Sequence, residues 1–459
     1  MFKNKNITVL GAGISGVGVA EVLADVGACV TLYDAMERTI ENEVKEKIVS
    51  AGGKIIMNKP VSQAIEHAEI VVLSPGISIY SSDVVKAQLA GKKVISEVEI
   101  AYLLNPGQLI AITGTNGKTT TTTLLGEMVA RKPVLSAVGG NIGQALSKQC
   151  TSLNTFDSIL VAEISSFQLE GIDTFKPHIS AILNITPDHL DRHKTFEKYV
   201  EEKAKVLKNQ TKTDYAILNI DDLNVKKLGL NTQAKVCYFS SCKELDEGVF
   251  VDINGIITLK YEGETIQFCS INEMLLFGKH NVENALVACA CAYFAGVSKE
   301  DIIAVLTTFM GVEHRIEYVV EIDGVKYYND SKATNPESTI KALEAFSVPL
   351  VFIAGGYDKH TDLSEMMGLV KNKVKHAIFI GNAKKRFMES ALQHDVENAS
   401  IVGSFLGAIE LAYKIAEHGE VVLLSPACAS FDMFKNYEER GKFFKKIVND
   451  IAMKSGEHL

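Results

Sequence analysis

Several features that would assign this sequence to a familiar class are missing. The eight cysteines are scattered and form no Cys-x-x-Cys pair, which argues against a zinc site built from sulfur ligands. No apolar run is long enough to span a bilayer, and no internal repeat or low-complexity segment is visible. The formal net charge of −9 argues against nucleic-acid binding, which needs a basic surface. Small anionic ligands are still allowed, because local sites rather than the whole surface would bind them.

What the chain does contain is ordinary for a globular protein. Apolar residues make up 47% and charged residues 22% of its 459 residues. That length suggests roughly two to four domains. Lys3 and Lys5 precede an apolar stretch, as in a signal peptide, but glycines interrupt it and no convincing cleavage site follows. We therefore expect a cytoplasmic protein with reduced cysteines, most of them buried as small apolar side chains.

Short apolar runs alternate with longer amphipathic ones, which is typical of α/β domains with parallel sheets. The predicted strands end near residues 10, 33, 73 and 95, then 113, 164 and 185, and finally 328, 354, 380 and 424. Residues 249–268 carry Asn-Gly and Glu-Gly pairs and predict antiparallel hairpins. We expect three consecutive α/β domains, at residues 1–96, 97–311 and 312–459. The first and last are Rossmann-like, and a small antiparallel sheet is added to the central one.

The first motif is GAGISG at residues 11–16, which follows a predicted strand and opens a predicted helix. With Asp34 at the end of the next strand, it matches the dinucleotide fingerprint, in which glycines let a pyrophosphate approach a helix N-terminus. A tight strand-to-helix turn without a ligand is the alternative. The loop at residues 73–77 ends another strand and could close over the same ligand. The residues alone leave open whether that ligand is NAD or another diphosphate.

The second motif is TGTNGKTT at residues 113–120, between a predicted strand and a predicted helix. In such a loop successive backbone N–H groups surround phosphate oxygens. Lys118 neutralises the β- and γ-phosphates, and the Thr119 hydroxyl reaches Mg²⁺. The strict pattern requires a glycine where Ile112 stands, so the loop is a shortened variant. Because strand, loop, Lys-Thr and helix follow in order, we predict a P-loop ATPase-like central domain that binds ATP.

Acidic, histidine and asparagine side chains accompany this loop. Glu163 ends a later strand, where a carboxylate suits Mg²⁺; capping of the following helix is the alternative. The segment DHLDRH at residues 188–193 follows the next strand and gathers two histidines and two aspartates. Asn281 and Asn284 share a helix face by their i, i+3 spacing, although capping that helix would also explain either one.

Polar loops also follow the strands predicted in the third domain. They lie at residues 313–315, 330–335, 355–359 and 425–430. Turn chemistry explains each loop taken alone. Their common location next to strand ends favours a site.

These motifs resemble those of the Mur ligases of bacterial peptidoglycan synthesis, over the whole length and in motif order. The resemblance rests on GAGISG at 11–16, SPGI at 74–77, VGGNIG at 138–143, EISSFQLE at 163–170, DHLDRH at 188–193 and SPACASFDMFKNYEERG at 425–441. It implies an ATP-dependent ligase that phosphorylates the carboxylate of UDP-MurNAc-L-alanine. D-Glutamate would then attack the acyl phosphate, with release of ADP and phosphate. The first domain would hold the uracil nucleotide rather than NAD.

The resemblance also implies the residues of each subsite. ATP would contact Gly114, Thr115, Asn116, Gly117, Lys118, Thr119, Thr120, Asn281, Arg315 and Asp330. The UDP substrate would contact Ile14, Ser15, Asp34, Gly76 and Asn141, and D-glutamate would contact Lys332, Thr334, Lys359, Ser430 and Tyr437. Lys118, His189 and Lys203 would be catalytic. Met36 and Glu37 stand where relatives carry a basic residue, and Tyr437 stands where some carry Phe.

Two Mg²⁺ ions are implied as well. Thr119 and Glu163 would bind one ion. His189 and Lys203 would bind the other, once CO₂ has converted the Lys203 amine to a carbamate. That conversion turns a cation into an anionic oxygen ligand, which suits Mg²⁺. Lys205 is a second candidate for this lysine, and a solvated helical lysine is the alternative for Lys203.

Three other functions stay open at this point. A sibling amide ligase would add another amino acid or extend folate with glutamate. A nicotinamide dehydrogenase would use GAGISG but leave TGTNGKTT and the third domain without a role. A non-catalytic nucleotide-binding module is the third. We expect a monomer that acts on small molecules, with no nucleic-acid or membrane partner.

Overall fold

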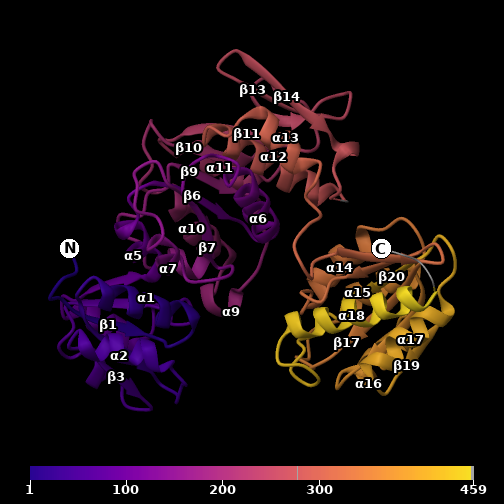
Figure 1. Cartoon of the computed structure of the whole chain (residues 1–459), viewed down its shortest axis with the longest axis horizontal. Coiled ribbons are helices and arrows are strands. Elements are labelled where there is room, and N and C mark those ends of the chain that lie inside the picture. Colours follow the sequence, from indigo (N-terminus) through magenta and orange to yellow (C-terminus); the bar gives the residue numbers. More distant parts are fainter. Residues whose placement is uncertain (277, 456–459) are drawn as a thin grey trace. The chain divides into compact units, whose positions relative to one another are not determined.

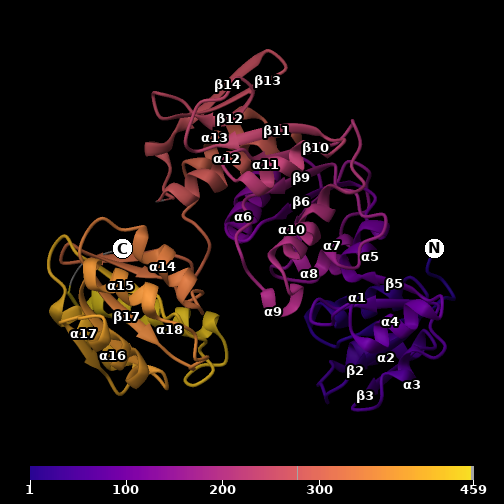
Figure 2. The ribbon, with the colours of Figure 1, turned by 180° about the vertical axis from the view of Figure 1, so that it is seen from behind.

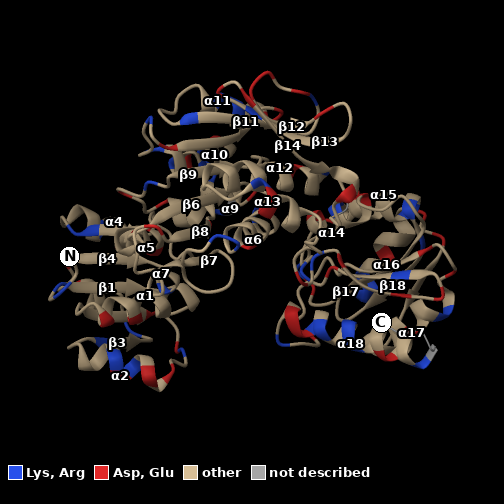
Figure 3. Cartoon of the chain, turned by 45° about the horizontal axis from the view of Figure 1, so that its top comes forward, with Lys and Arg blue, Asp and Glu red and all other residues tan. Residues whose placement is uncertain are grey.

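The computed structural model describes residues 1–276 and 278–455, which form three α/β sheets (Figures 1 and 2). The chain divides into two compact units. Unit 1 comprises residues 1–274 and 280–309 and contains two sheets, and unit 2 comprises residues 275–279 and 310–459 and contains one. Lys and Arg are interspersed with Asp and Glu in both units (Figure 3). Within the described ranges, no helix is long and apolar enough to cross a membrane.

The N-terminal sheet of unit 1 has five parallel strands in the order β3-β2-β1-β4-β5. They are β1 (Asn6–Leu10), β2 (Cys29–Asp34), β3 (Lys54–Met57), β4 (Ile70–Leu73) and β5 (Lys93–Ser96). The helices are α1 (Ile14–Asp25), α2 (Asn42–Ser50), α3 (Ser62–Ile65) and α4 (Ser82–Leu89). Alternate residues of β1 face opposite cores, since Val9 packs with α1 and α2 and Leu10 packs with α3 and α4. The strand order reverses between β1 and β4, the usual place for a ligand in such sheets.

The second sheet of unit 1 has nine strands in the order β14-β13-β12-β11-β10-β9-β6-β8-β7. Its parallel strands are β6 (Gln108–Thr113), β7 (Ser136–Gly140), β8 (Ile159–Glu163), β9 (Ile179–Ile182), β10 (Tyr215–Asn219), β11 (Lys235–Ser240) and β12 (Gly248–Val251). Two antiparallel strands, β13 (Ile256–Tyr261) and β14 (Glu264–Ser270), extend it. Glu262 and Gly263 join them with φ of 49° and 84°, the positive values of a two-residue hairpin turn. The predicted antiparallel addition is therefore confirmed.

Nine α-helices and two 3₁₀ turns accompany this sheet in the described residues. The helices are α5 (Glu97–Leu104), α6 (Lys118–Val129), α7 (Leu146–Cys150), α8 (Ser166–Leu169), α9 (Leu190–His193), α10 (Phe196–Ala204), α11 (Leu223–Gly229), α12 (Lys279–Phe294) and α13 (Lys299–Leu306). The 3₁₀ turns are η1 (Lys205–Leu207) and η2 (Ile271–Glu273). Helices α9 and α10 are short and follow β9, so they lie near the carboxyl edge of the parallel strands.

Unit 2 contains a six-stranded sheet in the order β15-β16-β20-β17-β18-β19, in which only the β15–β16 pair of the described strands is antiparallel. The strands are β15 (Glu317–Ile322), β16 (Val325–Asn329), β17 (Leu350–Gly355), β18 (Val374–Ile380), β19 (Ala399–Ile401) and β20 (Val421–Leu424). The helices are α14 (Pro336–Glu344), α15 (Ser364–Lys373), α16 (Lys384–Gln393), α17 (Phe405–Ile415) and α18 (Tyr437–Ser455). Phe352 packs with α14–α16 and Ile353 packs with α17 and α18. Helices therefore cover both faces, as the continuous apolar strands predict.

Candidate active site

The TGTNGKTT loop joins β6 to α6 with a backbone that only glycine permits at two positions. Gly114 and Gly117 have φ of 153° and 85°. A Cβ on Gly117 would lie 2.3 Å from Asn284 Oδ1, and one on Gly114 would lie 2.9 Å from Leu183 Cβ. Asn184, which follows β9, stabilises the loop, because its side-chain Oδ1 accepts a hydrogen bond from Asn116 N at 2.8 Å. The loop is thus preformed at the N-terminus of a twelve-residue helix, where anions bind favourably.

Lys118 and Thr119 open α6 directly beside this loop. The Lys118 ammonium donates to the carbonyls of Gly114 and Thr115, each at 2.9 Å, so its side chain lies across the loop. Thr119 and Thr120 are buried. The side chain of Asn284 in α12 accepts a hydrogen bond from Thr121 and donates one to Asn281 at 3.0 Å. The predicted shared face of the two asparagines is confirmed, and it contacts the P-loop helix.

Glu163 is the last residue of β8, next to β6, and only 2% of its surface is exposed. Its Oε1 accepts a hydrogen bond from Asn141 Nδ2 at 2.9 Å. Among the described residues its Oε2 has no hydrogen-bond partner. The alternative role of Glu163 as a helix cap is wrong, since Ser165 caps α8 in a capping box with Gln168. A buried carboxylate oxygen without a partner beside a P-loop fits a cation ligand.

Lys203, near the end of α10, is buried with 1% of its surface exposed. Its Nζ donates to Gly114 O at 2.7 Å and lies 4.8 Å from the centre of the Tyr199 ring. Burial, reinforced by the nearby Lys118 charge, holds the pKa of Lys203 well below its ordinary value. The alternative of a solvated helical lysine is therefore wrong. Lys205 instead forms an ion pair with Glu202 at 2.5 Å.

The two histidines of DHLDRH lie in different environments. His189 is exposed, has a φ of 51°, and is the N-cap residue of α9. Its backbone N–H donates to Asp188 Oδ1 at 2.8 Å. His193 is buried, with Nε2 3.0 Å from Ser166 Oγ, and burial lowers its pKa. Only His189 is therefore available to a ligand; the side chain of Asp191 lies outside the described part of the structure.

In the described part of the chain, no three His, Cys, Asp or Glu side chains form a group that could hold a metal ion by themselves. Mg²⁺ does not need such a group, because it commonly binds one or two carboxylates together with substrate phosphates and water. The arrangement of Thr119, Glu163 and the P-loop fits that pattern. His189 and Lys203 belong to the adjacent α9 and α10 segments.

At the N-terminal sheet, the predicted uridine-side residues gather at the carboxyl ends of β1, β2 and β4. Burial opposes ionisation of Asp34, but the N–H groups of Met36 and Ala12, with Arg38, outweigh it and lower the pKa of this carboxyl. Arg38 Nε lies 3.5 Å from Asp34 Oδ2, and sequence reasoning missed this basic residue because it stands two positions beyond Met36.

Two further uridine-side residues face open space. Ile14 is 77% exposed, and a Cβ on Gly76 would meet nothing within 4 Å. Ser15 is half-buried, and Asn141, which directly follows β7 of the second sheet, is exposed. The structure thus leaves room for a ligand beside Ile14 and Gly76.

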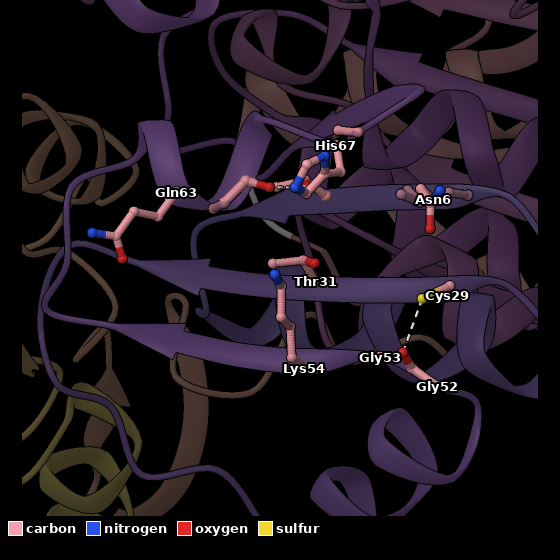
Figure 4. A pocket seen from close by; sticks show the side chains of 12 residues that line it. Asn6, Cys29, Thr31, Gly52, Gly53, Lys54, Gln63 and His67 are labelled. Carbon is pink, nitrogen blue, oxygen red and sulfur yellow. Dashed lines mark hydrogen bonds between the residues drawn. The ribbon is translucent and has the colours of Figure 1, made fainter.

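A separate cavity of about 360 Å³ lies at the opposite end of the N-terminal sheet (Figure 4). Asn6, Cys29 and Lys54, the first residues of three neighbouring strands, are among its lining residues. Cys29 Sγ donates to Gly52 O at 2.9 Å. Because GAGISG and SPGI follow the carboxyl ends of β1 and β4, this cavity is not the predicted nucleotide site.

In unit 2, Asp330 follows β16 and is buried. Its Oδ2 accepts a hydrogen bond from Ser425 Oγ at 2.6 Å, and its Oδ1 accepts one from Ile316 N at 3.2 Å. Burial raises the pKa of Asp330 to about 7, although these bonds and the half-buried Arg315 oppose the rise.

Four of the predicted D-glutamate residues lie on loops of the same unit, and the fifth, Tyr437, is the first residue of α18. Lys359 Nζ donates to Thr334 O at 3.2 Å, and Lys332 Nζ lies 6.0 Å from the centre of the Tyr437 ring. Ser430 is buried. The structure thus brings Lys332 close to Tyr437 and Thr334 close to Lys359.

Arg440 is a residue that sequence reasoning missed. It is fully buried in α18 and donates to Ser331 Oγ and Ser331 O, at 2.9 and 2.8 Å, and to Cys428 O at 3.1 Å. One guanidinium thus connects the loop after β16 with the loop after β20. Its place inside the long 425–441 motif is the only signal the sequence offers.

Three family descriptions match successive parts of the chain. They are "Mur ligase MurD-like, N-terminal domain" at residues 5–96, "Mur ligase middle domain" at 112–292 and "Mur ligase, glutamate ligase domain" at 314–428. The UDP-N-acetylmuramoylalanine–D-glutamate ligase of Caldanaerobacter subterraneus subsp. tengcongensis is 45% identical over 451 residues, 98% of this chain and 99% of the relative. The chain belongs to the Mur ligase family. The same-named ligase of Lachnoclostridium phytofermentans is 42% identical over 451 residues, again 98% and 99% of the two chains.

Solved structures agree with this Mur ligase in fold. The UDP-N-acetylmuramate-alanine ligase of Thermotoga maritima superposes with a TM-score of 0.60 at 17% identity, covering 97% of this chain and 99% of the other. The pseudomurein peptide ligase type C of Methanothermus fervidus gives a TM-score of 0.55 at 18% identity, covering 98% and 100%. The predicted α/β architecture with three sheets is therefore confirmed for a Mur ligase.

Proposed function

We propose that this Mur ligase joins D-glutamate to UDP-N-acetylmuramoyl-L-alanine in peptidoglycan precursor synthesis. ATP phosphorylates the substrate carboxylate, the amine of D-glutamate attacks the acyl phosphate, and ADP and phosphate leave. Full-length relatives that are 45% and 42% identical and carry the name of this ligase support the assignment. The observation that carries the chemistry is the preformed P-loop and, next to it, a buried Glu163 oxygen that has no partner among the residues the structure describes.

The residues of unit 1 hold the triphosphate in this proposal. N–H groups of Gly114–Thr120 and the N-terminus of α6 surround the phosphates, Asn281 contacts ATP, and Lys118 moves from the loop carbonyls to the β- and γ-phosphates. Mur ligases use ATP with Mg²⁺, which offsets the repulsion between a carboxylate and the γ-phosphate. Thr119 and Glu163 hold one ion. His189 and the carbamate of Lys203 hold a second.

Carbamylation of Lys203 is supported by its environment. The amine is buried, and its lowered pKa favours the neutral form. In that form the nitrogen lone pair attacks the carbon of CO₂, one C–O π bond opens, and the nitrogen releases a proton to solvent water, which leaves a carbamate anion. Labelled CO₂ should give a carbamate resonance that is lost in Lys203→Arg and kept in Lys205→Arg. An unchanged resonance in Lys203→Arg would exclude this lysine.

The three predicted domains divide the substrates in the same proposal. Residues 1–96 bind the UDP portion through Ile14, Ser15, Asp34 and Gly76, with Asn141 contributing from the central domain (97–311). Residues 312–459 bind D-glutamate through Lys332, Thr334, Lys359, Ser430 and Tyr437, and supply Arg315 and Asp330 to ATP. The enzyme is proposed to act as a cytoplasmic monomer on small molecules.

The decisive experiment is incubation of the enzyme with ATP, Mg²⁺, UDP-MurNAc-L-Ala and D-glutamate, with the product read by mass. Addition of one glutamate and stoichiometric phosphate release are expected. A panel of D-Glu, L-Lys, meso-diaminopimelate and L-Glu separates this function from sibling ligases. Lys118→Ala should fold but form no product, which excludes a merely nucleotide-binding role. No mass increase with D-glutamate would refute the proposal.

A further inference from the structure

Arg192, in the one-turn helix α9, contacts both the α8 segment and the loop that follows β4 in unit 1. Its Nε and Nη2 donate to Glu170 Oε1 and Oε2, at 2.9 and 2.6 Å. Its Nη1 donates to Pro75 O at 2.9 Å, and its Nη2 donates to Ile77 O at 3.1 Å. The guanidinium also lies 4.3 Å from the centre of the Phe167 ring. One side chain therefore joins the central domain to the SPGI loop of the N-terminal sheet.

The Glu170 pair makes this a rigid connection. The side chains of Arg192 and Glu170 are only 13% and 2% exposed. A bidentate pair between a guanidinium and a carboxylate fixes the plane of the fork, which a lysine cannot reproduce. Because Glu170 binds one edge of the guanidinium, the other N–H groups of Nη1 and Nη2 donate to the carbonyls of Pro75 and Ile77. The position of these carbonyls is thus set by the central domain.

A second contact reinforces the first at the far end of the same loop. Tyr80 donates through its hydroxyl to Glu202 Oε1 at 2.9 Å. Glu202 is fully buried and directly precedes Lys203 in α10. The loop at residues 74–80 is therefore attached to both α9 and α10. The predicted second-ion ligands lie at these two short helices: His189 is the N-cap residue of α9, and Lys203 lies in α10.

We infer that Arg192 is a positioning residue: it fixes the position of the SPGI loop relative to the phosphate-binding edge of the central sheet. Arg192 acts through the carbonyls on either side of Gly76 and touches no substrate. The inference rests on the proposed function, in which Gly76 contacts the UDP substrate. The fixed loop sets where the substrate carboxylate meets the γ-phosphate, and displacement of reacting groups by about 1 Å can cost about a hundredfold in rate.

The test compares steady-state kinetics of wild type, Arg192→Lys and Arg192→Ala, with each substrate varied in turn. We expect the KM for UDP-MurNAc-L-Ala to rise about tenfold or more and kcat to fall, while the KM for ATP changes less than about twofold. Lysine keeps the charge but loses the fork, so Arg192→Lys should fall between wild type and Arg192→Ala. Wild-type kinetics in Arg192→Lys and Arg192→Ala would overturn the inference.

Two further variants separate positioning from folding. Lys375→Met removes an ion pair with Glu417 and Glu420 in unit 2, and should lower stability without changing the KM for the UDP substrate. Tyr80→Phe removes the second contact and should raise the same KM, less than additively with Arg192→Lys because both hold one loop. Equal increases in every KM for Arg192→Lys would show a general structural defect and overturn the inference. Failure of wild type to form product would instead refute the proposed function.

Discussion

Replacement of Glu163 by Gln should abolish catalysis without weakening the ligand-free fold. The glutamine has the same shape and can still accept the hydrogen bond that Asn141 Nδ2 donates to Oε1 at 2.9 Å. What changes is the second oxygen, which is buried and has no partner among the described residues. A neutral amide costs less to bury there than an ionised carboxylate.

The substitution should lower kcat strongly but slightly raise the free energy of unfolding. Loss of one preorganised group that stabilises developing charge typically costs about a hundred- to a thousandfold in kcat, or about 2.7–4 kcal/mol. Relief of a buried charge is worth on the order of 1–2 kcal/mol. The melting temperature of the ligand-free variant should therefore equal or slightly exceed that of wild type.

Phosphate release and thermal unfolding, each measured with and without Mg²⁺ and ATP, test both parts. Ligand at about one hundred times its Kd stabilises wild type by about 2.7 kcal/mol, and this gain should shrink in Glu163→Gln. Glu97→Gln is the matched control, since Glu97 is also buried with one oxygen bonded to Ser147 N at 2.7 Å and the other without a partner in the described structure. It should keep full activity. A Glu163→Gln enzyme that retains turnover, or unfolds at a clearly lower temperature, would refute the reasoning.

Two other substitutions test the GAGISG loop and the buried Asp330 of unit 2. Gly16→Ala should lower the free energy of unfolding, measured in urea, by about 3 kcal/mol or more, because the added Cβ would lie 1.7 Å from Gly11 O. Gly13→Ala is the control and should leave that free energy unchanged, since a Cβ there would meet nothing within 4 Å. Burial raises the pKa of Asp330 to about 7, so folded protein binds more protons than unfolded chain between about pH 4 and that value. The free energy of unfolding should therefore fall as pH rises through this window, by on the order of 1 kcal/mol per unit, and Asp330→Asn should lack this slope. A stable Gly16→Ala or an unchanged slope in Asp330→Asn would contradict these two arguments.

Local patterns explain why much of the fold was predictable from the sequence. The helix expected after TGTNGKTT is α6, the helix expected to carry Asn281 and Asn284 is α12, and the hairpins expected at 249–268 are β12–β14. Each has a signal within a few residues: a Gly-Lys-Thr helix start, an alanine-rich periodic run, or Glu-Gly at a two-residue turn. The buried cysteines are confirmed for six of eight; Cys29 is half-buried and Cys242 is exposed.

Elements held by partners distant in sequence were not predictable. The strand β7 (Ser136–Gly140) ends in two glycines, which disfavour a strand, and it forms because it pairs with β8 along its whole length. The same limit applies to the site. Arg192 and Arg440 lie inside recognised motifs, but their acceptors are separated from them by up to 117 and 109 residues. The spacing of residues along the sequence predicts which of them share a face of one helix or strand. It does not predict which loop from another part of the chain packs against that face.

Two buried polar groups in unit 1 indicate where a charged ligand binds. In the P-loop region one carboxylate oxygen of Glu163 is buried with no hydrogen-bond partner in the described structure, and the amine of Lys203 is buried against a carbonyl rather than an acid. Such groups destabilise a fold unless something compensates them. The buried Glu170–Arg192 pair of the same unit is joined by two hydrogen bonds, so burial does not by itself leave a charged group there without a partner. A metal ion facing Glu163 would offset the first cost. Conversion of Lys203 to the proposed carbamate, with a second ion beside it, would offset the other.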